Sequence, residues 1–411
     1  MRLRGGGSAL PGLVVEKLDP GFLKRTLEGL PYGVVVISGT NGKTTTTKMV
    51  TQLLRKHGLK VFTNPTGSNF TRGIVASLLN HVDADGKLDA DIAVLELDEA
   101  HAVHFVRQVA PRYSLILNVL RDQLDRFGEI DHTARLLGKV VAKTTDGIVL
   151  NREDGLVRAL SVDIPKDKKV QYFGLSESLR KKFPSDAEMR GGPASKISLP
   201  HPHRGDVILE KFSGRDATFA FGSKTQDKVR LKIDGVYNVI NAAAALTLVR
   251  MVLGSDADHK ILLAELAEVR PAFGRGEAIE VDGHPLEIVL VKNPSGFRLA
   301  LESYAKRPAS TMIAINDNYA DGRDMSWLWD VDFESLAPSV AVISGIRAYD
   351  MALRLQYDNI ETGEVNTSIP HALWFLLETS PGPCRIYCTY TAMLSIRREL
   401  QKLGHELEAI E

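Results

Sequence analysis

Near the start of the chain, a run of β-branched residues, a glycine-rich turn and a helical segment follow one another, and this order constrains the fold strongly. Residues 34–37 predict a buried strand, and residues 44–57 carry apolar side chains at helical spacing. Between them lies Gly39-Thr40-Asn41-Gly42-Lys43-Thr44-Thr45. Its backbone N–H groups and helix start suit phosphate oxygens, Lys43 reaches terminal phosphates, and the Thr44 hydroxyl is a ligand type for Mg²⁺. We therefore predict a phosphate-binding loop, although only two residues separate Gly39 from Gly42, fewer than in the usual GxxxxGK[ST] pattern.

Further runs of β-branched and leucine residues predict the rest of a sheet. They lie at 61–63, 92–95, 115–117 and 148–150 and alternate with helical stretches. Strands that alternate with helices predict a doubly wound, mostly parallel α/β sheet with its ligand beyond the carboxyl ends of the strands. A second set of strands is expected at 286–291, 312–315, 340–343 and 385–389. We predict a P-loop domain over residues 1–277, with an irregular β-rich insertion at about 161–234, and a smaller Rossmann-like α/β domain over 278–411.

Composition excludes several classes of protein. The chain has 411 residues, with 51 Lys plus Arg and 51 Asp plus Glu. This balance removes the global electrostatic basis for a nucleic-acid partner. Hydrophobic residues make up 44% of the chain, as in an ordinary soluble protein, and no apolar run approaches the roughly 20 residues of a membrane-spanning helix. Because only Cys384 and Cys388 are present, no disulfide framework is expected, and the pattern favours a cytoplasmic protein.

Oxygen ligands for a metal are expected at the ends of the strands beside the phosphate loop. Glu96 ends the 92–95 strand, and Asp98 and Glu99 follow it. Asn118 ends the next strand and leads into a segment rich in carboxylate, amide and guanidinium groups at 121–128. Such side chains are suited to hold Mg²⁺ and an acceptor beside a nucleoside triphosphate. A solvated acidic turn or a surface salt-bridge network would give the same pattern.

Taken together, these residues resemble the ATP-dependent Mur ligase superfamily. The resemblance rests on the phosphate loop, Glu96, the 118–128 segment, the helix entry Tyr237-Asn238-Val239-Ile240-Asn241-Ala242-Ala243, and Gly274-Arg275. Residues 122–131, 292–296 and 316–330 resemble more closely the MurT-type synthetase subunits of lipid II isoglutaminyl synthase. The fold implied is a Mur-ligase-type central domain followed by a MurT-type C-terminal domain.

This resemblance implies a reaction and its participants. ATP with Mg²⁺ would phosphorylate the α-carboxylate of D-glutamate in the stem peptide of lipid II, and ammonia would then give D-isoglutamine. A separate GatD-type glutaminase subunit would supply the ammonia. The lipid II substrate would bring the chain to the inner face of the membrane.

The resemblance also implies roles for individual residues. Nucleotide binding falls to Gly39, Thr40, Asn41, Gly42, Lys43, Thr44 and Thr45, with Asn238 and Asn241 on the adenine side and Arg275 from the domain junction. Thr44, Glu96 and Gln123 would hold the metal. Asp324, or secondly Asp330, would face the glutaminase and orient its catalytic histidine. The alternative for both aspartates is that they bind substrate or cap a turn.

Two departures from the family patterns bear on these expectations. Mur ligases that add amino acids carry a carbamoylated lysine where this chain has about Leu137, and its absence agrees with ammonia as the acceptor. Many MurT-type chains carry a four-cysteine zinc ribbon, whereas residues 161–234 contain no cysteine, so zinc is not expected. Two other functions stay open: an amino acid ligase similar to folylpolyglutamate synthase, and a non-catalytic nucleotide-binding scaffold.

Overall fold

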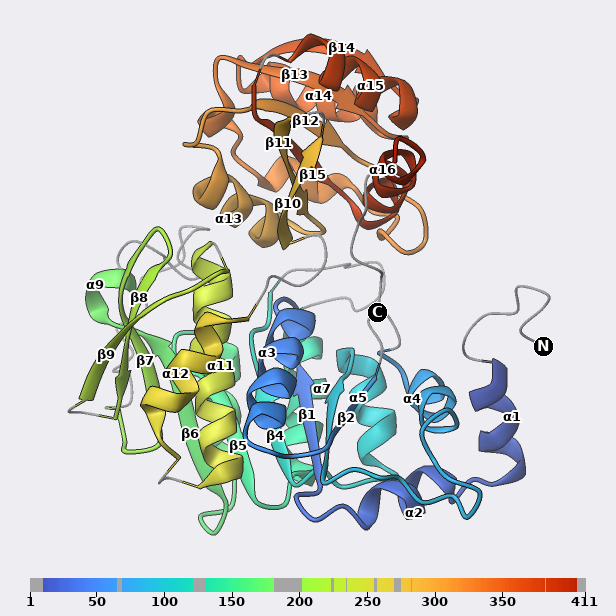
Figure 1. The fold of residues 1–411 in the computed structure, drawn as a ribbon, viewed down its shortest axis with the longest axis vertical. Coiled ribbons are helices and arrows are strands. Elements are labelled where there is room, and N and C mark those ends of the chain that lie inside the picture. Colours follow the sequence, from blue (N-terminus) through green and yellow to red (C-terminus); the bar gives the residue numbers. More distant parts are fainter. Residues whose placement is uncertain are drawn as a thin grey trace.

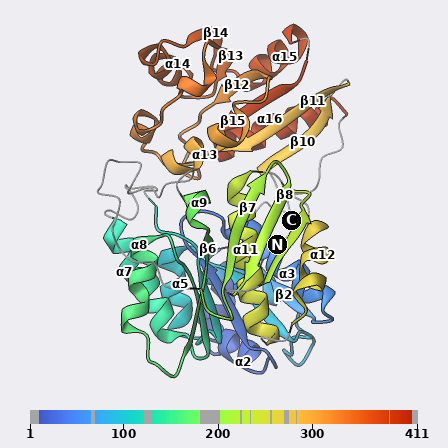
Figure 2. The ribbon, with the colours of Figure 1, turned by 90° about the vertical axis from the view of Figure 1, so that its left-hand side faces the viewer.

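Two β-sheets with helices on both faces make up the protein (Figure 1). The structure, a computed structural model, describes residues 10–64, 69–120, 130–180, 202–222, 225–233, 235–254, 257–269, 275–281, 283–380 and 382–404. In Figure 1 the unit built on the second sheet lies above the unit built on the first. The side view in Figure 2 places helix α13 of the upper unit over helix α11 of the lower one.

The first sheet has nine strands in the order β2-β3-β1-β4-β5-β6-β7-β8-β9. Strands β2 to β7 pair in parallel, and β8 and β9 are added in antiparallel fashion. Their bounds are β1 Val34–Ser38, β2 Val61–Thr63, β3 Ile92–Glu96, β4 Tyr113–Ile116, β5 Gly147–Asn151, β6 Lys169–Leu175, β7 Val207–Ser213, β8 Asp216–Phe221 and β9 Thr225–Arg230. Since β1 lies between β3 and β4, the loop after β1 is flanked by the carboxyl ends of both neighbours.

Alternation along the strands divides the side chains of the first sheet between two cores. Val35 and Ile37 of β1 join the core under α3 and α11, whereas Val34 and Val36 join the core on the opposite face. Helices α3 (Lys43–Lys56), α11 (Val236–Leu253) and α12 (His259–Ala267) cover the first face. The opposite face carries α2 (Phe22–Glu28), α4 (Thr71–Leu78), α5 (Glu99–Val106) and α7 (Ile130–Lys143), with α1 (Leu10–Leu18) packed on α4. Short helices α8 (Gly155–Ala159), η2 (Leu160–Asp163) and α9 (Glu177–Arg180) follow β5 and β6.

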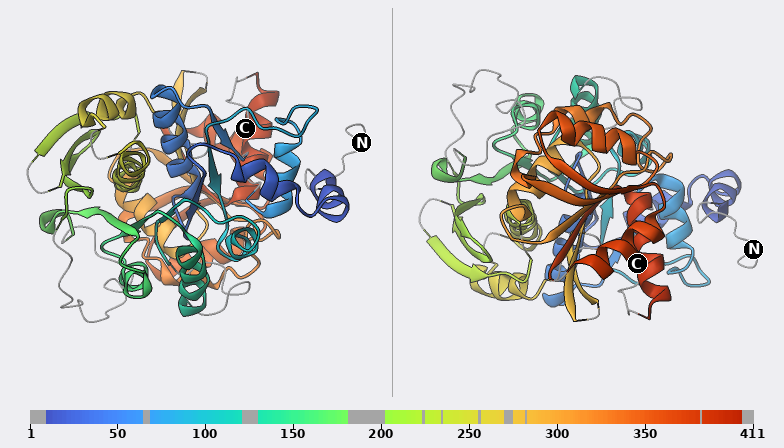
Figure 3. Two further views of the ribbon diagram at one scale, coloured as in Figure 1. Left: turned by 90° about the horizontal axis from the view of Figure 1, so that it is seen from below. Right: turned by 90° about the horizontal axis from the view of Figure 1, so that it is seen from above.

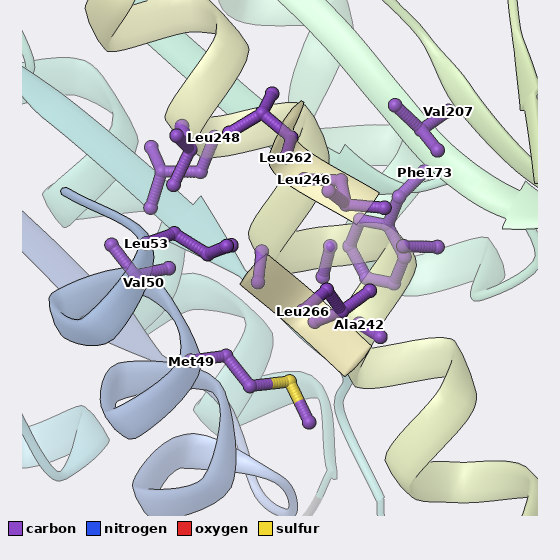
Figure 4. Packing of buried hydrophobic residues seen from close by; sticks show 14 of the residues in the cluster. Met49, Val50, Leu53, Phe173, Val207, Ala242, Leu246, Leu248, Leu262 and Leu266 are labelled. Atoms are coloured by element: carbon purple, nitrogen blue, oxygen red, sulfur yellow. The ribbon is translucent and has the colours of Figure 1, made fainter. Parts of the chain in front are cut away.

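Helix α11 occupies the centre of the first core. Its residues from Ala242 to Leu246 are completely buried, as expected for a helix that is apolar on all sides. In Figure 4, Ala242 and Leu246 lie beside Phe173 of β6, and Met49 and Leu53 of α3 complete the same cluster. This packing fixes the start of α11 close to the start of α3.

The second sheet has six strands in the order β10-β11-β15-β12-β13-β14, all parallel except the β10–β11 pair. The strands are β10 Arg275–Val281, β11 His284–Leu290, β12 Ser310–Ala314, β13 Ser339–Ser344, β14 Glu361–Asn366 and β15 Cys384–Cys388. One face packs against α13 (Pro294–Tyr304), η3 (Ser326–Asp330), η4 (Glu334–Leu336) and α14 (Ala348–Tyr357). The other packs against α15 (Ile369–Thr379) and α16 (Tyr390–Lys402), as the view from above in Figure 3 shows.

The predicted fold class, a doubly wound P-loop unit followed by a second α/β unit, is confirmed. Two details differ from the sequence-based expectation. The described parts of 161–234 include β6 to β9, which continue the first sheet and are more regular than the predicted insertion. The polar edge strands β9, β10 and β14 were not predicted, because edge strands need no continuous apolar run. The boundary at residue 277 stays a prediction, and β10, which begins at Arg275, already pairs within the second sheet.

Candidate active site

The phosphate loop connects β1 to α3 and depends on glycine at two positions. Gly39 has φ of 132° and Gly42 has φ of 88°, both in the region that disfavours side chains. A Cβ on Gly39 would lie 2.9 Å from the backbone of Asn118, and one on Gly42 would lie 2.5 Å from Oδ1 of Asn241. The loop therefore packs directly against the end of β4 and the first turns of α11.

Asn118 holds the loop in this shape. Its Oδ1 accepts a hydrogen bond from the backbone N–H of Asn41 at 2.8 Å, and its Nδ2 donates to the Asn41 carbonyl at 3.0 Å. The backbone carbonyl of Asn118 also accepts from the N–H of Thr40 at 3.0 Å. Asn118 is thus a structural clamp of the loop, and the sequence had suggested it only as part of a polar segment.

Lys43 lies folded across its own loop. Its Nζ donates to the carbonyl of Gly39 at 2.5 Å and to that of Thr40 at 3.3 Å. It also lies 3.7 Å from Oε2 of Glu99, the first residue of α5. Glu99 is buried, and this burial raises its pKa to about 7, against the opposing effect of the Lys43 charge. The loop lysine therefore has a carboxyl partner inside the protein.

Thr44 and Glu96, two of the three predicted metal ligands, lie together. The Thr44 hydroxyl donates to Oε1 of Glu96 at 3.0 Å. Asn64 fixes the backbone of Glu96 from both sides, with Oδ1 accepting from the Glu96 N–H at 2.9 Å and Nδ2 donating to its carbonyl at 3.0 Å. A hydroxyl and a carboxylate are the hard oxygen donors that Mg²⁺ prefers, so this pair fits the expected ion. Gln123, the third predicted ligand, lies outside the described residues.

An open cleft joins the phosphate loop to the second unit. Its empty space of about 730 Å³ includes open solvent at the mouth. The lining residues come from the loop, the start of α11, the end of β11 and helix α13: Asn41, Gly42, Gly235, Tyr237, Asn238, Asn241, Val289, Leu290, Lys292, Gly296, Leu299, Ala300, Ser303 and Tyr304. Asn238 and Asn241, which are predicted to bind the nucleotide, are among these lining residues. Arg275 lies opposite Val289 in the β10–β11 register.

Two residues of the second unit, Lys292 and Asn293, reach the phosphate loop, although neither is among the predicted site residues. Lys292 Nζ donates to the Thr40 carbonyl at 3.0 Å. Asn293 exchanges two side-chain hydrogen bonds with Asn41, at 3.2 and 3.0 Å. Asn293 Oδ1 also accepts from the Gly296 N–H at 2.7 Å and so caps α13. An asparagine before a proline is a recognisable helix start, but nothing local indicates a contact with residue 41.

The two predicted partner-facing aspartates lie in the segment around η3. Asp324 Oδ1 accepts from the Ser326 N–H at 2.9 Å at the start of η3, which is the turn-capping alternative stated above. The carbonyl of Asp330 accepts from the guanidinium of Arg298. Neither contact tests the predicted roles of the two carboxylates.

Asp321, which the sequence did not single out within this segment, is the buried carboxyl. It accepts hydrogen bonds from the N–H and hydroxyl of Thr391 at 2.7 and 2.5 Å and from the Asn318 N–H at 3.1 Å. Burial raises the pKa of Asp321 despite these bonds. Asp321 therefore fixes the 316–325 segment to the first turn of α16.

Comparison with known families agrees with this geometry. Residues 37–249 match the Mur ligase middle domain, and residues 290–393 match the MurT ligase C-terminal domain. MurF from Acinetobacter baumannii superimposes with a TM-score of 0.70 at 19% identity, covering 94% of this chain and 80% of that one. MurF from Thermotoga maritima in complex with ADP superimposes with a TM-score of 0.67 at 18% identity, covering 95% and 84%. The fold and the phosphate loop thus define a protein of the Mur ligase class.

Relatives found by sequence similarity identify the family within the Mur ligase class. The MurT subunit of lipid II isoglutaminyl synthase from Streptococcus pneumoniae strain R6 is 30% identical over 96% of this chain and 93% of its own length. The MurT subunit from Staphylococcus aureus strain COL is 28% identical over 86% of this chain and 84% of its own. The chain belongs to the MurT family.

Proposed function

We propose that this chain is the ATP-dependent synthetase subunit of a lipid II isoglutaminyl synthase. In this reaction the γ-phosphoryl group of ATP passes to the α-carboxylate of D-glutamate in the stem peptide, and ammonia then displaces phosphate to leave D-isoglutamine. The observation that carries the proposal is the junction of the phosphate loop, the Thr44–Glu96 pair and the interdomain cleft in a member of the MurT family.

The charges at this junction suit phosphoryl transfer to a carboxylate. Such a reaction depends on positioning the two anionic reactants and on neutralising the charge that develops between them. Lys43 and Lys292 both donate to the Thr40 carbonyl, Lys43 from the loop itself and Lys292 from the second unit, so two cations lie at the loop. Mg²⁺, when bound, would neutralise phosphate charge, and Thr44 and Glu96 are the described residues that would hold it.

The cleft gives the nucleotide a place beside the loop. Asn238 and Asn241 stand at the start of α11, and the apolar side chains of Leu290 and Leu299 line the second unit's wall. A purine ring suits such a wall, which has apolar faces and a few amide groups. We propose that the base binds here with its phosphates on the loop, and that Arg275 approaches from the start of β10.

We propose further that a GatD-type glutaminase subunit supplies ammonia and binds the second unit. The relatives' names describe a glutamine-hydrolysing enzyme with MurT as a subunit, which supports a partner. The exposed rings of Trp329 in η3 and Tyr357 at the end of α14 pack edge to face with centroids 5.1 Å apart. Exposed aromatic side chains are enriched at protein interfaces, and Asp324 and Asp330 lie in the same segment. We propose that Asp324 orients the partner's histidine.

Lipid II is membrane-linked, so we propose that the complex works at the inner face of the membrane. No described helix is long and apolar enough to cross a bilayer. In this proposal, the chain reaches the membrane by binding its substrate.

The test is amidation of lipid II by the purified chain. The chain is incubated with ATP, Mg²⁺ and lipid II, with either ammonium or glutamine plus its co-expressed glutaminase. Mass spectrometry should find an amide in place of the D-glutamate carboxylate with both nitrogen sources. ATP turnover without amidation from either source would overturn the proposal, and incorporation of an amino acid would favour the ligase alternative.

A further inference from the structure

A buried carboxyl group lies beside the phosphate-loop lysine. Glu99 begins α5 at the carboxyl end of β3, is 5% exposed, and places Oε2 at 3.7 Å from Lys43 Nζ. Lys43 on α3 and Asp98, directly before α5, are the charged groups that act on Glu99 among the described residues. The three predicted metal ligands do not include Glu99. Its only cationic partner in the described part of the chain is thus the lysine that a nucleotide would need.

Nucleotide phosphates and Glu99 compete for the same ammonium group. Lys43 Nζ now directs its hydrogen bonds to the Gly39 and Thr40 carbonyls and its charge toward Glu99. To contact a phosphate on the loop, the ammonium must move from these partners. A buried carboxylate that loses its cation, and gains a phosphate anion nearby, is destabilised in its charged form.

We propose that Glu99 is a positioning residue that couples nucleotide binding to proton uptake. When phosphate occupies the loop, Lys43 turns to the phosphate and a Glu99 carboxyl oxygen takes a proton from solvent, so that charge in the buried site stays balanced. The inference rests on the proposed nucleotide site and is independent of the amidation reaction.

The direction of the pH dependence follows from linkage. Both the departure of Lys43 and the arrival of phosphate raise the Glu99 pKa above its value of about 7 in the free protein. Because the bound state then holds more protons, affinity is greatest at low pH and falls as pH rises through this range. A rise of at least about one pKa unit on binding weakens affinity by about five- to tenfold between about pH 6 and about pH 8.5.

The experiment is calorimetric binding of ADP to the full chain, with EDTA or with Mg²⁺, across this pH range in two buffers of different ionisation heat. Wild type should take up protons above about pH 7, and E99Q should not. At about pH 8.5, E99Q should bind ADP about tenfold more tightly than wild type, with the two converging near about pH 6. The nucleotide itself also gains or loses protons over this pH range. The result is therefore the difference between wild type and E99Q in proton uptake and in affinity for ADP. Glu153, a partly buried glutamate that pairs with Arg152, provides the control: E153Q should behave as wild type.

Two results would overturn the inference. One is equal proton uptake by wild type and E99Q, and the other is weaker ADP binding by E99Q at high pH. If E99Q does not fold, the wild-type protein alone can test the inference. The inference is rejected if wild type takes up no more protons on binding ADP than the nucleotide itself accounts for. Failure of every variant to bind ADP would instead count against the proposed nucleotide site.

Discussion

Asn41 of the phosphate loop and Asn293 at the start of α13 hold each other by two amide hydrogen bonds, although 252 residues separate them in sequence. Asn118 fixes the backbone of Asn41 from the other side, and Asn293 caps α13 with the same Oδ1 that accepts from Asn41. The position of the second unit is thereby tied to the shape of the loop, and residues of both line the cleft.

Replacing Asn293 by serine should separate its two roles, the contact with Asn41 and the N-cap of α13. Serine keeps an N-cap oxygen for α13 but is too short to reach Asn41, so stability should change by less than about 1 kcal/mol. The KM for ATP should rise about tenfold, because the loop and the cleft wall are no longer held together. Steady-state amidation with varied ATP measures this. Asn366→Ser, at the far edge of the second sheet, is the control and should leave KM unchanged. A wild-type KM for N293S would mean that the pair does not position the nucleotide.

Glu96→Gln should weaken the response to Mg²⁺. A neutral amide oxygen is a poorer ligand for Mg²⁺ than a carboxylate, but it can still accept from the Thr44 hydroxyl, which preserves the local hydrogen bond. The Mg²⁺ concentration for half-maximal ATP turnover should rise about tenfold or more, while ADP binding in EDTA stays near wild type. Glu268→Gln on the surface is the matched control. An unchanged Mg²⁺ response would remove Glu96 from the metal site.

Asp324→Asn should affect one nitrogen source only. Asparagine can still accept from the Ser326 N–H, so η3 should keep its cap, while the charge proposed to orient the partner's histidine is lost. Glutamine-dependent amidation should fall by about 10²-fold or more, and ammonia-dependent amidation should stay within about twofold, because the synthetase site is untouched. Asp330→Asn, tested in parallel, shows which aspartate has this role. Equal loss with both sources would place Asp324 in the synthetase site.

Leu246→Ala should destabilise the first unit. Leu246 is completely buried on α11 among side chains from α3 and β6 (Figure 4), and deleting its methyl groups leaves a cavity. We expect a loss of about 2–5 kcal/mol in the free energy of unfolding, measured by urea denaturation. Leu353→Ala, at an exposed position on α14, should change it by less than about 0.5 kcal/mol. A small effect at residue 246 would show that the core around α11 repacks.

Features that depend on neighbours in sequence could be predicted from sequence alone. The strand, glycine turn and helix around Lys43 follow from propensity and spacing, and the placement of Glu96 beside Thr44 follows because parallel strands end at one edge. Asp324 could be assigned both a partner-facing role and a capping role, and residue patterns cannot choose between them. The roles of Arg275 and Gln123 likewise stay predictions.

Tertiary structure decided which distant groups meet. Asn293 contacts Asn41, Glu99 faces Lys43, and Asp321 holds Thr391, and each pair joins separate elements of the fold. Local patterns determine which side chains point inward from a helix or strand, because that depends on backbone periodicity. They do not determine which buried charge finds which partner, because that depends on how whole sheets and helices pack and on the cost of leaving a charge unpaired. The phosphate loop could thus be predicted from the sequence, while the residues that hold it in place could not.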